Sequence, residues 1–310
     1  MRRTRFAPAP TGPLHLGHVV NAIHVWGLAA RTGAQVLLRV EDHDRERSRA
    51  EFETGLLDDL DWLGFAADLH PTRDFRSGRC ESRQSDRAAL HEAAAASLLE
   101  RGLVYGCTCS RQTIAKTQKA MGRASNAYPG TCRARGLPPG PGLTWRVRAE
   151  PGVETFDDLL HGPQVQDPAS LHGDPAIRDR RGNWTYMFAV VVDDLLQGID
   201  LVVRGDDLLD ATAVQIRLAR LMGRQAPARF GHHALLMRTR TQKLSKADGA
   251  TGIVELRRAG WSPARVIGHA AALAGLAQRG AEIDATHVAT LCAAAQLASG
   301  SGRNVLPVHR

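Results

Sequence analysis

Apolar and polar positions along the first forty residues follow the order strand, helix, strand. Residues 3–8 predict a strand, residues 15–31 have the apolar spacing of a helix, and Gln35–Val40 predict a second strand after a Thr-Gly turn. This pattern is the beginning of a β-α-β unit. In sheets built from such units, ligands bind at the carboxyl ends of the parallel strands.

The rest of the chain continues the pattern on both sides of an interruption. Apolar runs at Tyr186–Val192 and Leu201–Val203 predict strands of a buried parallel sheet. The alanine-rich end from residue 279 is expected to be weakly ordered, and no internal repeat is found. Helical spacing predicts five more helices, over residues 49–63, 85–102, about 208–222, about 252–260 and about 263–277.

Residues 103–184 have a different character from the segments around them. They contain a cluster of cysteines, a Pro-Gly-rich segment over 136–142 and short strand-like pieces such as Thr144–Arg148. This composition predicts a module inserted between the two halves of the sheet.

Composition narrows the class of protein. The 310 residues are 43% hydrophobic and 23% charged, as in ordinary globular proteins. No apolar run approaches the roughly 18 residues of a membrane span, and charges and prolines interrupt the N-terminus where a signal peptide would have its apolar core. We therefore expect a cytoplasmic protein without membrane contact, acting as a monomer. The net charge of +8 favours contact with a polyanion such as nucleic acid, although a high arginine content raises the charge in the same way.

Two short stretches far apart in the chain predict a site for ATP. The first runs Arg5-Phe-Ala-Pro-Ala-Pro-Thr-Gly-Pro-Leu-His15-Leu-Gly17-His18. Its helix begins near His15, so free backbone N–H groups face an anion, and His15 and His18 lie on one helical face where both can donate to phosphate oxygens. Gly17 leaves room for a nucleotide against the backbone. The alternative is an ordinary turn with solvated histidines.

The second stretch is Lys243-Leu-Ser-Lys246, for which the alternative is an exposed loop. The chain has only four lysines among its 40 basic residues, and two of them stand in this tetrapeptide. That choice suits a compact, mobile ammonium that follows the charge on a leaving pyrophosphate. His15, His18, Lys243 and Lys246 are the catalytic candidates, and His15, Gly17, His18 and Lys246 the ATP-binding ones.

These stretches resemble the two signatures of class I aminoacyl-tRNA synthetases of the glutamyl group. The resemblance covers at least residues 5–250. Because the chain is too short for the large anticodon-binding region of a full glutamyl enzyme, it is most similar to the family's shortened paralogues. Those attach glutamate to the queuosine base at the wobble position of tRNA(Asp).

The resemblance implies a glutamate pocket. Arginine suits a carboxylate because its guanidinium is planar and forked, Glu41 can hold an ammonium group, and the Tyr186 hydroxyl can add a hydrogen bond. Without the resemblance, Glu41 would as readily be a solvated acid and Tyr186 a core aromatic residue. Ala9 departs from the family pattern, which usually has serine there, so we expect glutamate binding weaker by about 1 kcal/mol. The implied pocket residues are Arg5, Phe6, Ala7, Pro8, Ala9, Glu41, Tyr186 and Arg204.

Cys107, Cys109 and Cys132 predict one structural zinc ion, because thiolates are the ligands zinc prefers. From the residues alone the fourth ligand is open between Tyr128, water and a histidine. The paralogues' Cys-x-Cys…Tyr-x3-Cys pattern implies Tyr128. The alternative is three reduced, half-buried cysteines.

The resemblance implies that Mg-ATP activates L-glutamate to glutamyl-adenylate, and that glutamate then passes to queuosine in tRNA(Asp). Three alternatives remain open: a truncated enzyme that charges the terminal adenosine of tRNA(Glu), a non-catalytic RNA-binding paralogue, and a nucleotidyltransferase acting on a small metabolite.

The expected fold is α/β, a doubly wound parallel (Rossmann-like) sheet split by a zinc-containing insertion, with a small helical C-terminal unit. The predicted units are the first half of the catalytic domain over 1–102, the inserted module over 103–184, the second half over 185–240, and the Lys-Leu-Ser-Lys loop with the helical unit over 241–310.

Overall fold

The computed structural model describes residues 2–122, 127–236 and 252–295. Strands β1 (Arg3–Phe6) and β2 (Gln35–Leu38) pair in parallel, with Arg3 opposite Gln35, and helix α1 (Leu16–Thr32) connects them. The predicted strand–helix–strand beginning is thus confirmed. Helix α1 ends at Gly33, whose φ of 65° is the left-handed conformation that glycine adopts without strain.

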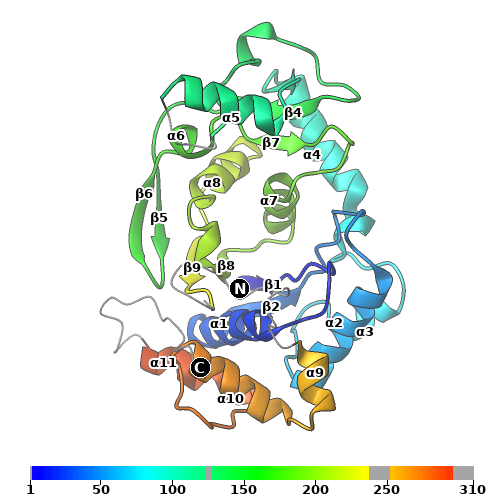
Figure 1. Ribbon diagram of the computed structural model, residues 1–310, viewed down its shortest axis with the longest axis vertical. Coiled ribbons are helices and arrows are strands. Elements are labelled where there is room, and N and C mark those ends of the chain that lie inside the picture. Colours follow the sequence, from blue (N-terminus) through cyan, green and yellow to red (C-terminus); the bar gives the residue numbers. More distant parts are fainter. Residues whose placement is uncertain (1, 123–126, 237–251, 296–310) are drawn as a thin grey trace.

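A second sheet continues beside β1. Its strand order is β6 (Gly162–Gln166), β5 (Glu154–Asp158), β9 (Arg229–His233) and β8 (Leu201–Gly205), with β8 and β9 parallel and β5 and β6 forming an antiparallel hairpin. Strand β1 runs next to β8, since Asp200 N donates to Arg3 O at 3.1 Å. The fold is therefore α/β with parallel strands, as predicted, and the carboxyl ends of β1, β2, β8 and β9 gather at one edge (Figure 1).

A third sheet lies at the far end of the molecule from α10, beyond α7 and α8 (Figure 1). It consists of β3 (Val104–Cys107), β4 (Thr144–Val147) and β7 (Ala176–Arg178), all antiparallel. Val104, Val147 and Ile177 from these strands share a core with helices that come from outside residues 103–184. The segment predicted as an insertion is therefore packed against its neighbours. The unit boundaries at 102, 184 and 240 stay predictions.

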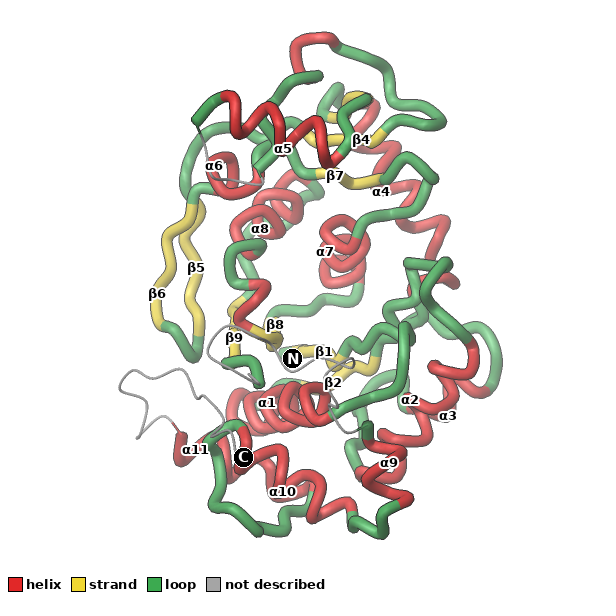
Figure 2. The backbone as a smooth tube through the Cα atoms, viewed as in Figure 1, coloured by secondary structure: helices red, strands yellow, loops and turns green. Residues whose placement is uncertain are grey.

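Helices cover both faces of the parallel strands (Figure 2). The five helices predicted by spacing are present, with the one at 85–102 divided into a short 3-10 turn, η1 (Gln84–Arg87), and α4. In chain order the remaining helices are α2 (Ala50–Leu63), α3 (Thr72–Arg76), α4 (Ala88–Glu100), α5 (Arg111–Ala120), α6 (Pro168–His172), α7 (Tyr186–Leu196), α8 (Thr212–Leu221), α9 (Ile253–Arg258), α10 (Pro263–Leu273) and α11 (Val288–Ala295).

The strand prediction for Tyr186–Val192 is wrong, because these residues begin helix α7. Residues 187–192 are rich in valine, which favours strands, and they include no polar residue that could reveal a helical period. The polar positions did carry the helical signal. Tyr186, Asp193 and Gln197 are spaced by seven and four residues, which places them on one helical face.

Residues 279–295 differ from the expectation of weak order from residue 279, and the rest of that segment lies outside the described residues. Helix α11 packs against α1, where a Cβ at Gly27 would lie 2.3 Å from Cys292 Sγ, so only glycine permits this approach. Arg31 Nη1 adds a hydrogen bond to Cys292 O at 2.7 Å. The alanine-rich composition of residues 279–295 is therefore compatible with a packed helix, and Gly27 of α1 allows its close approach.

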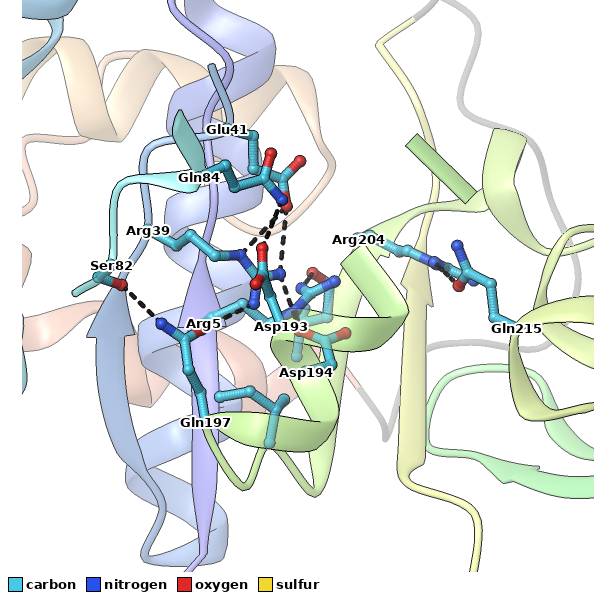
Figure 3. A network of polar contacts seen from close by, with 12 residues as sticks. Arg5, Arg39, Glu41, Ser82, Gln84, Asp193, Asp194, Gln197, Arg204 and Gln215 are labelled. Atoms are coloured by element: carbon cyan, nitrogen blue, oxygen red, sulfur yellow. Dashed lines mark hydrogen bonds and ion pairs between the residues drawn. The ribbon is translucent and has the colours of Figure 1, made fainter. Parts of the chain in front are cut away.

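Buried ion pairs join α7 to β1 and to the end of β2 (Figure 3). Asp194 accepts from Arg5 Nε at 3.1 Å and from Arg39 Nη2 at 2.8 Å. The neighbouring Asp193 accepts from Arg87 Nε at 2.6 Å and lies 3.0 Å from His91 Nε2. Burial alone would raise the pKa of Asp193, but the His91 contact and the nearby guanidinium groups lower it to about 2.

No helix among the described residues is long and apolar enough to cross a membrane.

Asp193→Asn is expected to destabilise the fold by about 3–5 kcal/mol, because the buried Arg87 loses its counter-charge. The measurement is denaturant unfolding at neutral pH, with Asp61→Asn as the control; Asp61 pairs with Arg76 at the surface and is expected to contribute less than about 1 kcal/mol.

The Asp193 effect has a defined pH window. Its folded pKa of about 2 lies below the unfolded value near 3.9, so its stabilisation is present above about pH 3.9 and is lost as the pH falls toward 2. The difference between the two proteins should narrow over that interval. A constant difference would show that the charge of Asp193 is not its cause.

Candidate active site

A cavity of about 580 Å³ lies where the parallel strands end. Phe6, Pro8 and Ala9, also predicted for the site, are not among its lining residues; Phe6 is buried in the core, where its ring lies 5.3 Å from that of Trp26. Lys243 and Lys246 lie outside the described residues. The predicted residues that do line the cavity are Arg5, Ala7, His15, Gly17, His18, Glu41, Tyr186 and Arg204.

The first turn of α1 is built from its two histidines. His15 is the N-cap residue and accepts from Gly17 N through Nδ1 at 3.1 Å, while its own N–H donates to His18 Nδ1 at 3.1 Å. Because both Nδ1 atoms accept, the proton of each neutral ring is on Nε2. The two rings, with centroids 4.0 Å apart, thus form a capping pair that also lines the cavity.

The structure gives a reason for glycine at position 17 that the sequence did not reveal. A Cβ at this position would lie 2.9 Å from Cε1 and 3.0 Å from Nδ1 of His15. The glycine therefore makes room for the capping ring of His15, where the sequence suggested room for a nucleotide.

Arg5 and Glu41 line the cavity but are also held by neighbours. Arg5 uses Nε for Asp194 and Nη1 for Val203 O at 3.2 Å. Glu41 Oε1 accepts from Arg39 Nη2 at 3.1 Å. Both side chains are thus fixed in position by the buried ionic cluster that also contains Asp193 (Figure 3).

Arg204 stands in a different electrostatic position. It is only 5% exposed, and among the described residues it has no ion pair. Burial lowers its pKa, in contrast to the pKa of Arg39, which its carboxylate neighbours raise despite complete burial. A buried guanidinium that faces a cavity without a counter-ion favours an anionic ligand.

Tyr186 begins α7 and lies between Arg204 and a second, adjoining cavity. This cavity, of about 810 Å³, is lined by the loop after β2, the start of α5 and the segment after β7. We call it the arginine cleft, after its lining residues Arg47, Arg111, Arg146, Arg180 and Arg181. An ion pair between Arg181 and Glu46 crosses it.

Sequence reasoning missed three polar residues that line the first cavity, Asn21, Asp207 and His233. His233 Nε2 lies 3.2 Å from Asn21 Oδ1, which joins α1 to the end of β9. Asn21 follows His18 by three residues on the same helical face, a signal that was available. His233 had none, because Gly231-His-His233 does not read as a buried strand.

The three predicted cysteines come together at and just after the end of β3 and in the segment between α5 and β4. Cys109 Sγ lies 3.6 Å from Cys132 Sγ, and the ligand atoms of Cys107, Cys109 and Cys132 all lie within 4.8 Å of one another. The Tyr128 hydroxyl joins them, 3.4 Å from Cys107 Sγ and accepting from Cys132 N at 2.7 Å. This donor set fits a metal ion that takes sulfur ligands.

The thiols of this cluster differ in acidity. Burial disfavours the Cys132 thiolate, but hydrogen bonds from Thr108 and Tyr128 lower the pKa of Cys132 to about 6. For Cys109, burial and the neighbouring sulfurs raise the pKa to about 11. Within the cluster, Cys132 is thus the thiol that ionises more readily than Cys109.

Most of the chain matches a known family. Residues 1–294 fit the model of the catalytic domain of class I tRNA synthetases (E and Q). The chain belongs to this family.

Relatives and solved structures of the family agree with the fold. A Rhodobacter capsulatus protein named glutamyl-Q tRNA(Asp) synthetase is 39% identical over 281 residues, which cover 85% of this chain and 97% of that protein. A glutamate–tRNA ligase of Frankia alni is 38% identical over 84% of this chain but only 53% of its own length. The crystal structure of a glutamate tRNA ligase from Elizabethkingia meningosepticum in complex with its amino acid superimposes with a TM-score of 0.71 at 26% identity, covering 87% of this chain and 60% of that one.

Acidification below about pH 6.5 is expected to destabilise this synthetase through two histidines beside the cavity. Burial lowers the pKa values of His24 and His232 below the usual 6.5. The unfolded chain then binds more protons, so the stabilisation is complete above about pH 6.5 and is lost as the pH falls through the folded values, by at most about 1.4 kcal/mol per pH unit for each histidine.

The test compares wild type with His24→Phe, which keeps a ring against His233, whose centroid lies 4.5 Å from that of His24. The free energy of unfolding should fall less steeply between pH 6.5 and 5 in the variant. The control is His287→Asn at an exposed position, which shows how the free energy of unfolding changes with pH when only a surface histidine is replaced. Equal slopes for wild type and His24→Phe would remove His24 as a cause.

Proposed function

We propose that this synthetase activates L-glutamate with Mg-ATP and transfers it from glutamyl-adenylate to queuosine at the wobble position of tRNA(Asp). The observation that carries the proposal is the unpaired, buried Arg204 in the cavity that His15 and His18 also line. The name of the R. capsulatus relative, which matches this chain over nearly its whole length, supports the choice of acceptor. The enzyme acts as a monomer in the cytoplasm, since one chain supplies every side chain that the proposal uses and the substrates are found there.

ATP binds at the beginning of α1 in this proposal. The N-terminus of α1 and the Nε2–H groups of His15 and His18 meet the phosphates, and Gly17 keeps the capping ring in place. Lys243 and Lys246 follow the charge onto pyrophosphate as the carboxylate attacks the α-phosphorus. The Mg²⁺ that accompanies ATP shields the phosphate charge.

Glutamate binds at the ends of β1 and β8. Arg204 meets a carboxylate, with Arg5 as the second cation, while Glu41 accepts from the ammonium group and Tyr186 adds its hydroxyl. Phe6, Pro8 and Ala9 contribute through the backbone that carries Ala7 into the cavity wall. The contact from Glu41 N to Pro8 O, at 3.0 Å, supports this, because it fixes Glu41 against that segment.

The arginine cleft takes the acceptor nucleotide. It adjoins the glutamate site at Tyr186, so a base held there reaches the adenylate. Arg47 and Arg181 of its lining are paired with Asp44 and Glu46. Arg111 and Arg180, which have no carboxylate partner among the described residues, suit a phosphate backbone. Trp184 offers an aromatic surface for a base.

One zinc ion is held by Cys107, Cys109, Tyr128 and Cys132 and is structural. It would connect the end of β3 to the loop before β4. The cluster adjoins the arginine cleft, because Cys109 is one of the residues that line it. Zinc takes no part in the chemistry of activation.

The acceptor is tested by incubating the protein with labelled glutamate, ATP and tRNA(Asp) that carries or lacks queuosine. Glutamate should be transferred only to the modified tRNA. Transfer to tRNA(Glu) at its terminal adenosine would instead favour the second candidate, a glutamate–tRNA ligase, which the F. alni relative supports. Glutamate-dependent exchange of labelled pyrophosphate into ATP, measured without tRNA, separates both from a protein that only binds RNA.

The metal is tested by elemental analysis. The purified protein should contain about one zinc ion, and Cys109→Ser should lose it and loosen the segment around the cluster, because three remaining ligands hold zinc less tightly. Cys80→Ser, at a buried thiol outside the cluster, is the matched control and should keep its zinc. Stoichiometric zinc in Cys109→Ser would remove that residue from the ligand set.

A further inference from the structure

Three buried polar side chains form a chain of contacts across the sheet, from β5 through β9 to Arg204 in β8. Asp158 is the last residue of β5, His232 lies in β9, and Arg204 lies in β8, so the three stand on adjacent strands of one sheet (Figure 1). His232 Nδ1 lies 2.5 Å from Asp158 Oδ2, and Arg204 Nε lies 3.0 Å from His232 Nε2. The side chains of Asp158 and His232 are both fully buried.

The chemistry of the contacts fixes where the protons are. Arg204 Nε–H can only donate, so His232 Nε2 must accept, and the ring proton is on Nδ1, where it is donated to Asp158. The Thr212 hydroxyl, 3.2 Å from Nε2, can donate to the same atom. Burial lowers the pKa of His232, which favours the neutral ring that this arrangement requires.

We propose that Asp158 is a positioning residue for the glutamate site: it holds His232 in the Nδ1–H tautomer, and His232 in turn orients the guanidinium of Arg204 at the cavity. This inference rests on the proposed role of Arg204 in binding glutamate.

The guanidinium is held on almost every side by neutral acceptors. Besides His232, the acceptors are Gln215 Oε1 at 2.5 Å from Nη1, and Leu208 O and Thr212 Oγ1 at 3.2 and 2.9 Å from Nη2. These contacts use four of the five N–H groups and fix the plane of the guanidinium without neutralising its charge. Figure 3 shows the contact between Arg204 and Gln215 apart from the ionic cluster around Asp193 and Asp194.

An acceptor without charge is needed next to Arg204 if its charge is to serve a ligand. A carboxylate in place of His232 would pair with the guanidinium and compete with glutamate. The imidazole keeps Asp158 one residue further away and still transmits its orientation. Thus the acid sets the tautomer, while Arg204 stays an unpaired cation.

Asp158→Asn tests the tautomer directly, because its two oxygens do different work. Oδ1 accepts from Leu160 N and His161 N, each at 2.9 Å, and Oδ2 faces His232. In the asparagine variant the carbonyl oxygen keeps the turn, so the amide NH₂ faces His232 Nδ1. The ring must then accept at Nδ1 and carry its proton on Nε2, where it opposes the N–H of Arg204.

The experiment has a spectroscopic and a binding readout. In ¹⁵N spectra of histidine-labelled protein, His232, assigned with the His232→Asn variant, should show the Nδ1–H tautomer in wild type and the Nε2–H tautomer in Asp158→Asn. By calorimetry, Asp158→Asn should weaken L-glutamate binding by about 10-fold or more, since one charged hydrogen bond loses its orientation. ATP binding should change less than about 3-fold.

A double-mutant cycle separates positioning from general damage. If Asp158 acts through Arg204, Asp158→Asn should have no further effect on glutamate binding in an Arg204→Gln background. The exposed neighbour Asp157, changed to Asn, is the matched control on the same strand and should leave glutamate affinity unchanged. If Asp158→Asn folds poorly, His232→Asn replaces it in the test. This variant keeps a donor to Asp158 but removes the acceptor for Arg204, so it should weaken glutamate binding by a similar factor.

Each outcome bears on a different claim. An Nε2–H tautomer in wild type, or an undiminished effect of Asp158→Asn in the Arg204→Gln background, overturns the positioning role. Unchanged glutamate affinity in Arg204→Gln alone overturns the proposed function of Arg204 and the positioning role with it. Loss of affinity in Arg204→Gln combined with normal affinity in Asp158→Asn overturns only the positioning role.

Discussion

Two adjacent carboxylates, Asp193 and Asp194, are the constraint on which the rest of the structure depends. Removing a carboxylate from water costs several kcal/mol unless cations and hydrogen bonds replace the water, so the position of α7 requires arginines around it. Those arginines come from β1, the end of β2 and η1, which are distant in the sequence. The ionic cluster therefore specifies which segments meet, as well as adding to stability.

The same constraint divides the arginines of the site into two kinds. Arg5 and Arg39 share Asp194, and Arg39 also pairs with Glu41, so the ionic cluster holds in place the part of the cavity wall that Arg5 and Glu41 form. Arg204 reaches none of these carboxylates and is held by neutral acceptors. Among the described residues no carboxylate lies within ion-pair distance of Arg204, so its positive charge lies where an anion can enter the cavity.

The sequence predicted the parts of this arrangement that are local. The beginning of α1, with its capping histidines, follows from residues within one turn, and the cysteine cluster follows from spacing over 25 residues. It did not predict that valine-rich α7 is a helix, because residues 187–192 include no polar residue that could reveal a helical period. It also could not find Asp158, whose role depends on β5 joining β9 across more than 70 residues.

That strand pairing brings the segment predicted as an insertion into contact with residues beside the cavity. Residues 103–184 supply β5, which carries Asp158 to His232, and also β7, which leads into the wall of the arginine cleft and then into Tyr186. Val104, Val147 and Ile177 in the third sheet pack against Phe188 of α7. A displacement of this segment would thus shift α7, which carries Asp193 and Asp194, because closely packed interiors transmit strain. The segment proposed to hold the acceptor and the strands proposed to hold glutamate therefore pack together as one structure, which suits the proposed meeting of two substrates at Tyr186.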